Sequence, residues 1–249
     1  MKKVNHETSP ESLQAPRAFR FDILTLFPHI FDSVFSDTIL LRALEKELFS
    51  VHYHQIRDFT LPQDKHRKVD DVPYGGGAGM VMKPEPIVAA MEKALEDGAG
   101  KDLKKVRRIY LSPQGRPLQQ KHLKAYLQYD QIILLCGRYE GVDERALELV
   151  IDEEVSIGDY VLTGGEFAAM VFMDAVVRLI PGVVGSEASL GDESFSQNLL
   201  EYPQYTRPPE FRDKKVPEIL LSGDHKKIEN WRRAQSLSRT TKKRPDLLK

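Results

Sequence analysis

Short apolar runs alternate with apolar residues at helical spacing between residues 19 and 180. Compact runs of Val, Ile, Leu and Phe are typical of buried strands in a parallel sheet. They predict strands at residues 19–27, 51–56, 108–111, 131–136 and 154–157. Apolar residues at helical spacing predict helices at residues 30–48, 84–96, 118–127, 142–150 and 165–180. Strands separated by single helices indicate an α/β domain with a parallel sheet.

The predicted helix at 165–180 is apolar on nearly every side, because Glu166, Asp174 and Arg178 are its only polar residues. Such a helix is buried on most of its faces, and Pro181 ends it. A second subunit that covers part of the helix is one explanation, and it implies a dimer. The other is a central helix of a monomer, with Asp174 and Arg178 paired one turn apart. Small and turn-forming residues at 182–192 then indicate a linker to a second, smaller unit.

Composition excludes several classes of protein. The 249 residues are 41% hydrophobic and 29% charged, which is ordinary for a globular protein. The one cysteine, Cys136, excludes an internal disulfide framework and a cysteine-rich zinc site. The apolar runs are far shorter than the roughly 20 residues of a membrane-spanning helix. The first 17 residues lack the apolar core of a secretory signal. We therefore expect a cytoplasmic protein with no membrane segment and a disordered tail at residues 1–17.

Charge is distributed unevenly along the chain. Residues 203–249 hold 13 Lys and Arg against 6 Asp and Glu, whereas the preceding 202 residues hold 23 against 31. A basic end on an acidic body predicts a polyanionic partner, because basic groups displace phosphate counterions. The only tryptophan, Trp231, lies in the basic segment beside Arg232 and Arg233, where a base or ribose could stack. The alternative is a solvated helix face with Trp231 as its core anchor.

Three turn-rich loops follow apolar strands, at residues 112–116, 137–141 and 158–166. Ligands of an open α/β sheet bind beyond the carboxyl ends of its strands, so these loops predict one shared pocket. A fourth glycine-rich loop, YGGGAGM at 74–80, matches neither the dinucleotide-binding fingerprint nor the P-loop. Its glycines still permit positive φ and close backbone approach.

Several longer stretches resemble bacterial tRNA (guanine-N1)-methyltransferases, which methylate guanosine 37 beside the anticodon. They are YLSPQGR at 110–116, CGRYEGVDER at 136–145, SIGDYVLTGGE at 156–166, VDDVPYGGGAGM at 69–80, LIPGVVG at 179–185, YTRP at 205–208 and LLSGDHKKIENWR at 220–232. They occur in the same order as in the family, and the resemblance extends from about residue 19 to residue 248.

The resemblance implies an α/β methyltransferase domain at 18–184 whose parallel sheet forms a deep trefoil knot, a rare exception among chain topologies. It also implies a linker at 185–192 and a small, mainly helical, basic tRNA-binding domain at 193–249. S-adenosylmethionine is expected to bind bent inside the knot, and two subunits of a homodimer are expected to form each active site. The family also implies a preference for tRNAs with guanosine at position 36, and use of Mg²⁺, although no metal-ligand spacing in the sequence indicates a metal site.

Residues that match the motifs of the family take their expected roles from it. Main-chain groups and apolar side chains are expected to hold the adenine of the donor, and the acids to complement its positive charges. The expected donor-binding residues are Tyr110, Leu111, Ser112, Pro113, Gly137, Glu140, Ser156, Ile157, Gly158, Asp159, Tyr160, Val161, Leu162, Gly164 and Gly165. The alternative for the small residues is that they only permit tight turns. The expected tRNA-binding residues are Ser189, Tyr205, Arg207, Trp231, Arg232 and Arg233.

Methylation of guanine N1 sets a specific chemical requirement. Neutral guanine carries a proton on N1, so a base must remove it while negative charge develops on O6. The resemblance assigns the cation near O6 to Arg178, since arginine stays charged and offers a planar fork of donors. Where the family has the aspartate base, this chain has Glu193, with Asp192 one residue earlier. We expect Glu193 to be the base, with Asp192 as the alternative.

Two other functions are alternatives, although the donor-loop motifs weigh against the first, and SIGDYVLTGGE and SGDHKKIENWR against the second. The first is a non-catalytic RNA-binding protein, which binds no methyl donor. The second is a related knotted methyltransferase with another target, such as a ribose hydroxyl, which needs no base for a ring N–H.

Overall fold

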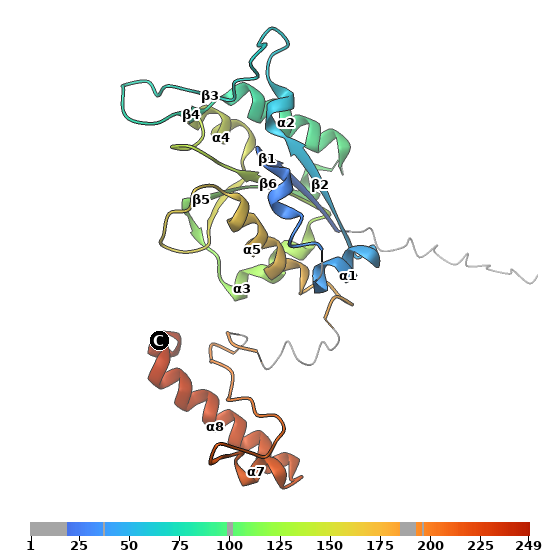
Figure 1. The fold of residues 1–249 in the computed structure, drawn as a ribbon, viewed down its shortest axis with the longest axis vertical. Helices are drawn as coiled ribbons and strands as arrows, with labels where there is room; N and C mark the ends of the chain where they lie inside the picture. The colour runs from blue at the N-terminus through green and yellow to red at the C-terminus, as the bar shows by residue number, and fades with distance from the viewer. Residues whose placement is uncertain (1–18, 37, 99–101, 185–192, 196) are drawn as a thin grey trace, which may run out of the picture. The chain divides into compact units, whose positions relative to one another are not determined.

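The computed structural model describes residues 19–36, 38–98, 102–184, 193–195 and 197–249 (Figure 1). The predicted tail at 1–17 and the predicted linker at 185–192 therefore lie outside the described residues. The chain forms two compact units. The first comprises the chain up to Leu118 together with Ala125–Val183, and the second comprises Gln119–Lys124 with Val184–Lys249.

The first unit is built on a five-stranded sheet in which every neighbouring pair of strands is parallel. Its strands are β1 (Phe19–Thr25), β2 (Phe49–Gln55), β5 (Val106–Pro117), β6 (Gln131–Cys136) and β7 (Glu153–Ser156). The strand order is β2-β1-β6-β5-β7. All six residues of β6 are buried, as expected for a central strand. The predicted α/β class with a parallel sheet is confirmed.

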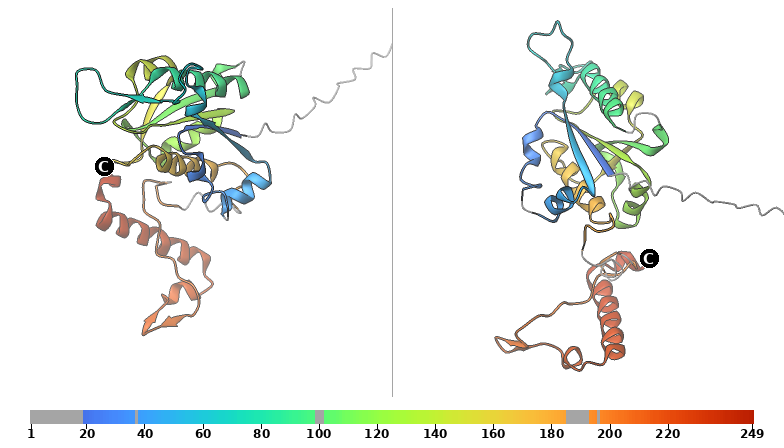
Figure 2. Two further views of the ribbon diagram at one scale, coloured as in Figure 1. Left: turned by 45° about the horizontal axis from the view of Figure 1, so that its top comes forward. Right: turned by 90° about the vertical axis from the view of Figure 1, so that its right-hand side faces the viewer.

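Helices cover both faces of this sheet (Figures 1 and 2). The α-helices of the described residues are α1 (Ile39–Glu45), α2 (Pro84–Asp97), α3 (Gln120–Leu123), α4 (Glu144–Val150), α5 (Glu166–Val177), α7 (Glu218–Leu221) and α8 (His225–Lys243). Short 3₁₀ turns lie at Pro28–Phe31, Ile56–Phe59, Leu103–Lys105, Lys124–Gln128 and Pro245–Leu248. Two small antiparallel pairs are β3 (Asp70–Asp71) with β4 (Val81–Met82), and β8 (Glu210–Phe211) with β9 (Lys214–Lys215).

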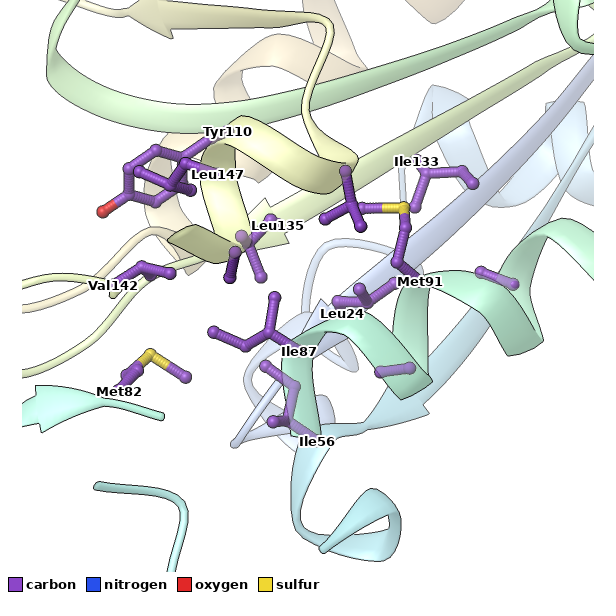
Figure 3. Close-up of a cluster of buried hydrophobic side chains, with 14 of the residues drawn as sticks. Leu24, Ile56, Met82, Ile87, Met91, Tyr110, Ile133, Leu135, Val142 and Leu147 are labelled. Carbon is purple, nitrogen blue, oxygen red and sulfur yellow. The ribbon is translucent and has the colours of Figure 1, made fainter. Parts of the chain in front are cut away.

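One face of the sheet carries α2 and α4 over a continuous apolar cluster (Figure 3). Alternate residues of the central strands, such as Leu24, Ile133 and Leu135, meet Ile87 and Met91 of α2 in this cluster. Full burial of such side chains stabilises the fold by about 1.5–3 kcal/mol each. On the other face Phe172 of α5 packs edge-on against Tyr126, with ring centroids 4.9 Å apart.

Two predicted helices are shorter than the apolar pattern indicated. Residues 30–48 form a 3₁₀ turn and then α1, because Thr38 is extended and its side chain accepts a hydrogen bond from the Leu40 N–H. Such a side-chain cap starts a helix and prevents its extension backwards. The helix predicted at 118–127 begins later, because the Leu118 N–H donates to the Ser156 carbonyl of β7 at 2.8 Å. It is α3 followed by the 3₁₀ turn at Lys124–Gln128.

A polar network is buried beside the apolar cluster of the first unit. The Asp22 carboxylate, which is fully buried, accepts two hydrogen bonds from Arg20 at 2.7 Å. It also lies 2.7 Å from His54 Nε2 and accepts a 2.7 Å hydrogen bond from Gln131. Burial alone raises the pKa of Asp22, but the hydrogen bonds from Arg20, His54 and Gln131 outweigh it and hold the pKa below its ordinary value.

The second unit is organised by α8, whose first turn is capped by the Asp224 carboxylate on the Lys227 N–H. The Thr240 hydroxyl accepts a hydrogen bond from the Leu200 N–H at 2.8 Å, which ties the entering chain to α8. Across the described ranges of both units, none of the helices has the length and apolar character of a membrane-spanning segment.

Candidate active site

A cavity of about 340 Å³ lies where three segments meet: residues 110–114 within β5, and the loops after β6 and β7. The carboxyl ends of the strands are the edge at which an open parallel sheet binds ligands. The three loops that the sequence analysis grouped therefore line one cavity. Its predicted donor-binding residues are Tyr110, Leu111, Ser112, Pro113, Gly137, Glu140, Ser156, Ile157, Gly158, Tyr160, Val161, Leu162, Gly164 and Gly165.

The first wall of the cavity comes from an excursion within β5. Leu111 pairs with Val155 of β7, the chain leaves the sheet, and Arg116 pairs with the same Val155. The return brings Gly115 against the β7 backbone, because a Cβ there would lie 2.4 Å from the Val155 nitrogen. Strand β5 is therefore much longer than the predicted strand at 108–111.

The second wall is the turn after β6. The Gly165 N–H donates to the Gly137 carbonyl at 2.9 Å, and a Cβ on Gly165 would lie 2.7 Å from the Cys136 Cα. Glycine is needed here because two backbones touch. A Cβ on Gly137 would lie 2.8 Å from the Tyr110 hydroxyl oxygen, so the backbone of this turn stays bare. Burial raises the pKa of Tyr110 to about 12, so its hydroxyl is a neutral hydrogen-bonding group.

A buried ion pair joins the second wall to α5. The Glu166 carboxylate accepts a hydrogen bond from the Thr25 hydroxyl at 2.8 Å and lies 2.9 Å from Arg138 Nη2. Arg138 also donates to the Thr163 carbonyl at 3.1 Å, and its guanidinium lies 4.5 Å from the centre of the Phe27 ring. We call Thr25, Phe27, Arg138 and Glu166 the α5 latch. It connects the ends of β1 and β6 with the start of α5.

The α5 latch was not predicted from the sequence. Glu166 could have indicated it. A carboxylate in a largely apolar helix is buried only when it has a partner, so its presence predicts a cation or a donor nearby. The cavity also includes lining residues that were not predicted, among them Gln114, Arg138, Tyr139 and Thr163. In the opposite direction, Asp159 was predicted to bind the donor but is not among the residues that line the cavity.

The expected catalytic residues lie in different parts of the chain. Arg178 is half-buried at the C-terminal end of α5 in the first unit, and its N–H donates to the Asp174 carbonyl at 3.2 Å. Glu193 is half-buried in the second unit. Asp192 and the predicted tRNA-binding residue Ser189 lie outside the described residues.

Most of the other predicted tRNA-binding residues lie around a groove in the second unit. The groove has a volume of about 730 Å³, and Tyr205, Arg207, Trp231 and Arg232 are among its lining residues. The Tyr205 and Trp231 rings lie 6.4 Å apart. The Arg232 guanidinium lies 4.8 Å from the centre of the Tyr202 ring. Arg233 is exposed on α8.

The expected use of Mg²⁺ finds no support in the arrangement of side chains. Among the described residues, no group of three or more His, Cys, Asp or Glu side chains is placed to hold a metal ion.

Comparison with known proteins identifies the family. The family model described as tRNA (Guanine-1)-methyltransferase TrmD matches residues 19–249. The chain belongs to the tRNA (Guanine-1)-methyltransferase family.

Curated relatives named tRNA (guanine-N(1)-)-methyltransferase cover nearly the same range. The protein of Carboxydothermus hydrogenoformans is 54% identical over 230 residues, which are 92% of this chain and 87% of that protein. That of Ruminiclostridium cellulolyticum is 54% identical over 228 residues, 92% of this chain and 95% of that protein. That of Clostridioides difficile is 50% identical over 230 residues, 92% of this chain and 97% of that protein.

Membership of the tRNA (Guanine-1)-methyltransferase family implies S-adenosylmethionine as the methyl donor, and the cavity fits such a molecule. Its size suits a small ligand, and apolar side chains such as Leu111, Ile157 and Leu162 line it together with Gly137, Gly164 and Gly165.

Proposed function

We propose that this protein transfers the methyl group of S-adenosylmethionine to N1 of guanosine 37 in tRNA, chiefly where guanosine also occupies position 36. Membership of the tRNA (guanine-N1)-methyltransferase family carries the coarser part, methylation of a tRNA guanine. The observation that carries the mechanism is the meeting of the β5 excursion with the loops after β6 and β7 around one cavity of ligand size. The donor-binding roles of the fourteen predicted residues that line the cavity, and of Asp159, are part of the proposal.

S-adenosylmethionine, when bound, supplies a methyl group on a positively charged sulfur. Glu193 accepts the N1 proton of guanine, so that the N1 lone pair becomes free to form the new bond to the methyl carbon as the bond from that carbon to sulfur breaks and S-adenosylhomocysteine leaves. Arg178 stabilises the negative charge that develops on O6. Glutamate reaches one methylene further than the aspartate of the family, and Asp192 remains the alternative base.

We propose a homodimer in which two subunits complete each active site, and α5 supports this proposal. Gly165 lies in the cavity immediately before α5, and Arg178 follows the other end of the helix. Ala168 of α5 also lines the cavity and lies ten residues before Arg178, or roughly 15 Å along the helix axis, further than one arginine side chain reaches. This separation favours an Arg178 that is supplied to each cavity by a second copy of the chain.

The surface of α5 has the character of a subunit interface. Phe167 and Val171, one turn apart on the same face, are 55% and 49% exposed. Val161, in the loop before the helix, is 85% exposed. Exposed large apolar side chains on one face, as Phe167 and Val171 are, are typical of a contact site. A second subunit on this surface would cover the part of α5 that the sheet leaves open.

The finer features of the fold are also proposals. The excursion of β5 and its return onto the same residue of β7, together with the contact of Gly165 with the β6 backbone, support a knotted loop around the cavity. We propose a trefoil-knotted catalytic domain at 18–184 and a tRNA-binding domain at 193–249. We also propose that the protein acts in the cytoplasm, on tRNA. The basic charge of the C-terminal part and the aromatic groove beside Arg207 support the RNA contact.

The test is to map the methylated base after incubation with S-adenosylmethionine and unmodified tRNA transcripts. We expect 1-methylguanosine at position 37 of a transcript with G36 and G37, and none when G37 is replaced by A. Methylation at another base or at a ribose would reject the target. Salt-dependent RNA binding without donor binding would instead indicate a non-catalytic RNA-binding protein.

The base is tested separately with Glu193→Gln and Asp192→Asn. Loss of a general base slows turnover by roughly 10²–10⁴-fold. We expect this loss for Glu193→Gln with unchanged donor affinity, and little change for Asp192→Asn. The reverse result assigns the base to Asp192, and full activity of the double variant would refute the proton-transfer mechanism.

A further inference from the structure

The glycine-rich loop at 74–80, between β3 and β4, is a sequence motif whose residues are not among those that line the cavity. Gly75, Gly76, Gly77 and Gly79 all have positive φ, between 79° and 129°. This backbone conformation favours glycine, so turn geometry alone accounts for the residue type at each position. The four glycines differ in what surrounds them.

The register of this loop against the cavity loop 138–143 is fixed by backbone hydrogen bonds. The Glu140 N–H donates to the Met80 carbonyl at 2.9 Å, and the Met82 N–H donates to the Gly141 carbonyl at 2.9 Å. The Asp143 N–H donates to the Met82 carbonyl at 3.0 Å. Met82 and Val142 form a parallel bridge at the edge of the apolar cluster (Figure 3). The residues that directly follow Gly79 are therefore held against the cavity loop.

The Glu140 side chain occupies the space that a side chain at position 79 would fill. A Cβ on Gly79 would lie 2.4 Å from both Cγ and Oε1 of Glu140, closer than non-bonded atoms approach. No atom lies within 4 Å of a Cβ on Gly75 or Gly76, and a Cβ on Gly77 would only touch Pro73 at 3.9 Å. Glu140 itself lines the cavity, and it is an exposed, flexible side chain.

We infer that Gly79 is a positioning residue: by lacking a side chain, it lets the Glu140 carboxylate rest at the cavity, where it binds the positively charged part of the methyl donor. This inference rests on the proposed function of the cavity. The three atoms nearest to a Cβ at position 79 all belong to the Glu140 side chain, so Glu140 turns aside while the surrounding backbone stays in place. The substitution therefore displaces one carboxylate without opening the fold.

The test compares Gly79→Ala with Gly76→Ala. Both replace a glycine at nearly the same φ, +83° and +79°, so the backbone strain is matched and only the contact with Glu140 differs. S-adenosylmethionine affinity is measured by calorimetry on the full-length protein, and thermal unfolding is measured in parallel. We expect Gly79→Ala to bind the donor about tenfold more weakly, as for loss of one charged contact, and Gly76→Ala to bind it as the parent does.

The deciding measurement repeats both substitutions in a Glu140→Ala background, which has no side chain left to displace. There, Gly79→Ala should weaken donor binding no more than Gly76→Ala does. An equal loss with and without Glu140 overturns the inference, and so does a Glu140→Ala variant with full donor affinity. A Gly79→Ala protein that fails to fold while Gly76→Ala folds also overturns it, because the clash was then not relieved by Glu140. Donor binding needs no RNA, so failure to methylate guanosine 37 leaves this test readable.

Discussion

Replacement of Glu166 tests whether the α5 latch holds the site together. Glu166 is fully buried and its carboxylate has two partners, the Thr25 hydroxyl at 2.8 Å and Arg138 Nη2 at 2.9 Å. Glu166→Ala removes both contacts and leaves the Arg138 guanidinium without a counter-charge. Glu166→Gln keeps the size and an oxygen that accepts from Thr25, and removes only the charge.

The surroundings of Glu166 and Arg138 determine how much the free energy of unfolding should fall. Removal of one partner of a buried ion pair costs about 3–5 kcal/mol. The Arg138 side chain is 17% exposed and keeps its contacts with the Thr163 carbonyl and the Phe27 ring, so we expect the lower end for Glu166→Ala, about 3 kcal/mol. At about 2–4 °C per kcal/mol, the unfolding midpoint falls by roughly 6–12 °C. For Glu166→Gln we expect the free energy of unfolding to fall by about 1–2 kcal/mol, because the hydrogen bond from Thr25 is kept.

The assay is thermal unfolding followed by circular dichroism or calorimetry. Glu148, exposed on α4, offers the control: Glu148→Ala should change stability by less than about 0.5 kcal/mol. Replacing both charged partners by apolar residues, Glu166→Leu with Arg138→Met, should recover part of the loss, because no unpaired charge remains. A Glu166→Ala midpoint indistinguishable from that of Glu148→Ala would refute the latch.

Three further predictions concern other parts of the first unit. Asp22→Asn should lower the unfolding midpoint at neutral pH. Because the pKa of Asp22 is lowered in the folded state, its contribution to stability is complete above the unfolded pKa of about 3.9 and is lost as the pH falls through the folded pKa. A difference in unfolding midpoint between parent and variant that stays constant down to about pH 3 would contradict this. Arg178→Ala should reduce turnover by about 10²–10³-fold with donor affinity nearly intact, measured by single-turnover kinetics and calorimetry; equal losses in both would indicate a structural role. Gly115→Ala should cost about 1–3 kcal/mol in thermal unfolding and weaken donor binding, since its Cβ meets the β7 backbone, and parent-like values for both would contradict the close approach.

Local patterns predicted the elements that are decided by their own residues. Strand β6 was predicted at its exact bounds, because six consecutive buried residues leave no ambiguity about a central strand. Helix α2 was predicted within one residue, since its proline-containing first turn and Gly98 mark both ends. The prediction of one pocket also held, because parallel strands bring their carboxyl ends to the same edge of the sheet.

Features that depend on distant partners escaped prediction. The hydrogen bond from Thr25 to Glu166 spans 141 residues of sequence, and that from Gln131 to Asp22 spans 109. Neither residue of such a pair carries a local signal that names the other. The return of Arg116 onto Val155, and the place of Gly79 against Glu140, depend in the same way on how two strands or loops meet.

The order of strands and helices, the basic C-terminal part and the family motifs are written in the linear chain, because each rests on neighbouring residues. Other features are properties of the folded chain. They include the glycines that are required by a close contact and not only by a turn, the cation that pairs with a buried carboxylate, and the loops that line one cavity. The reason is physical: burial and hydrogen bonding act through space, and their partners become neighbours only once the sheet has assembled.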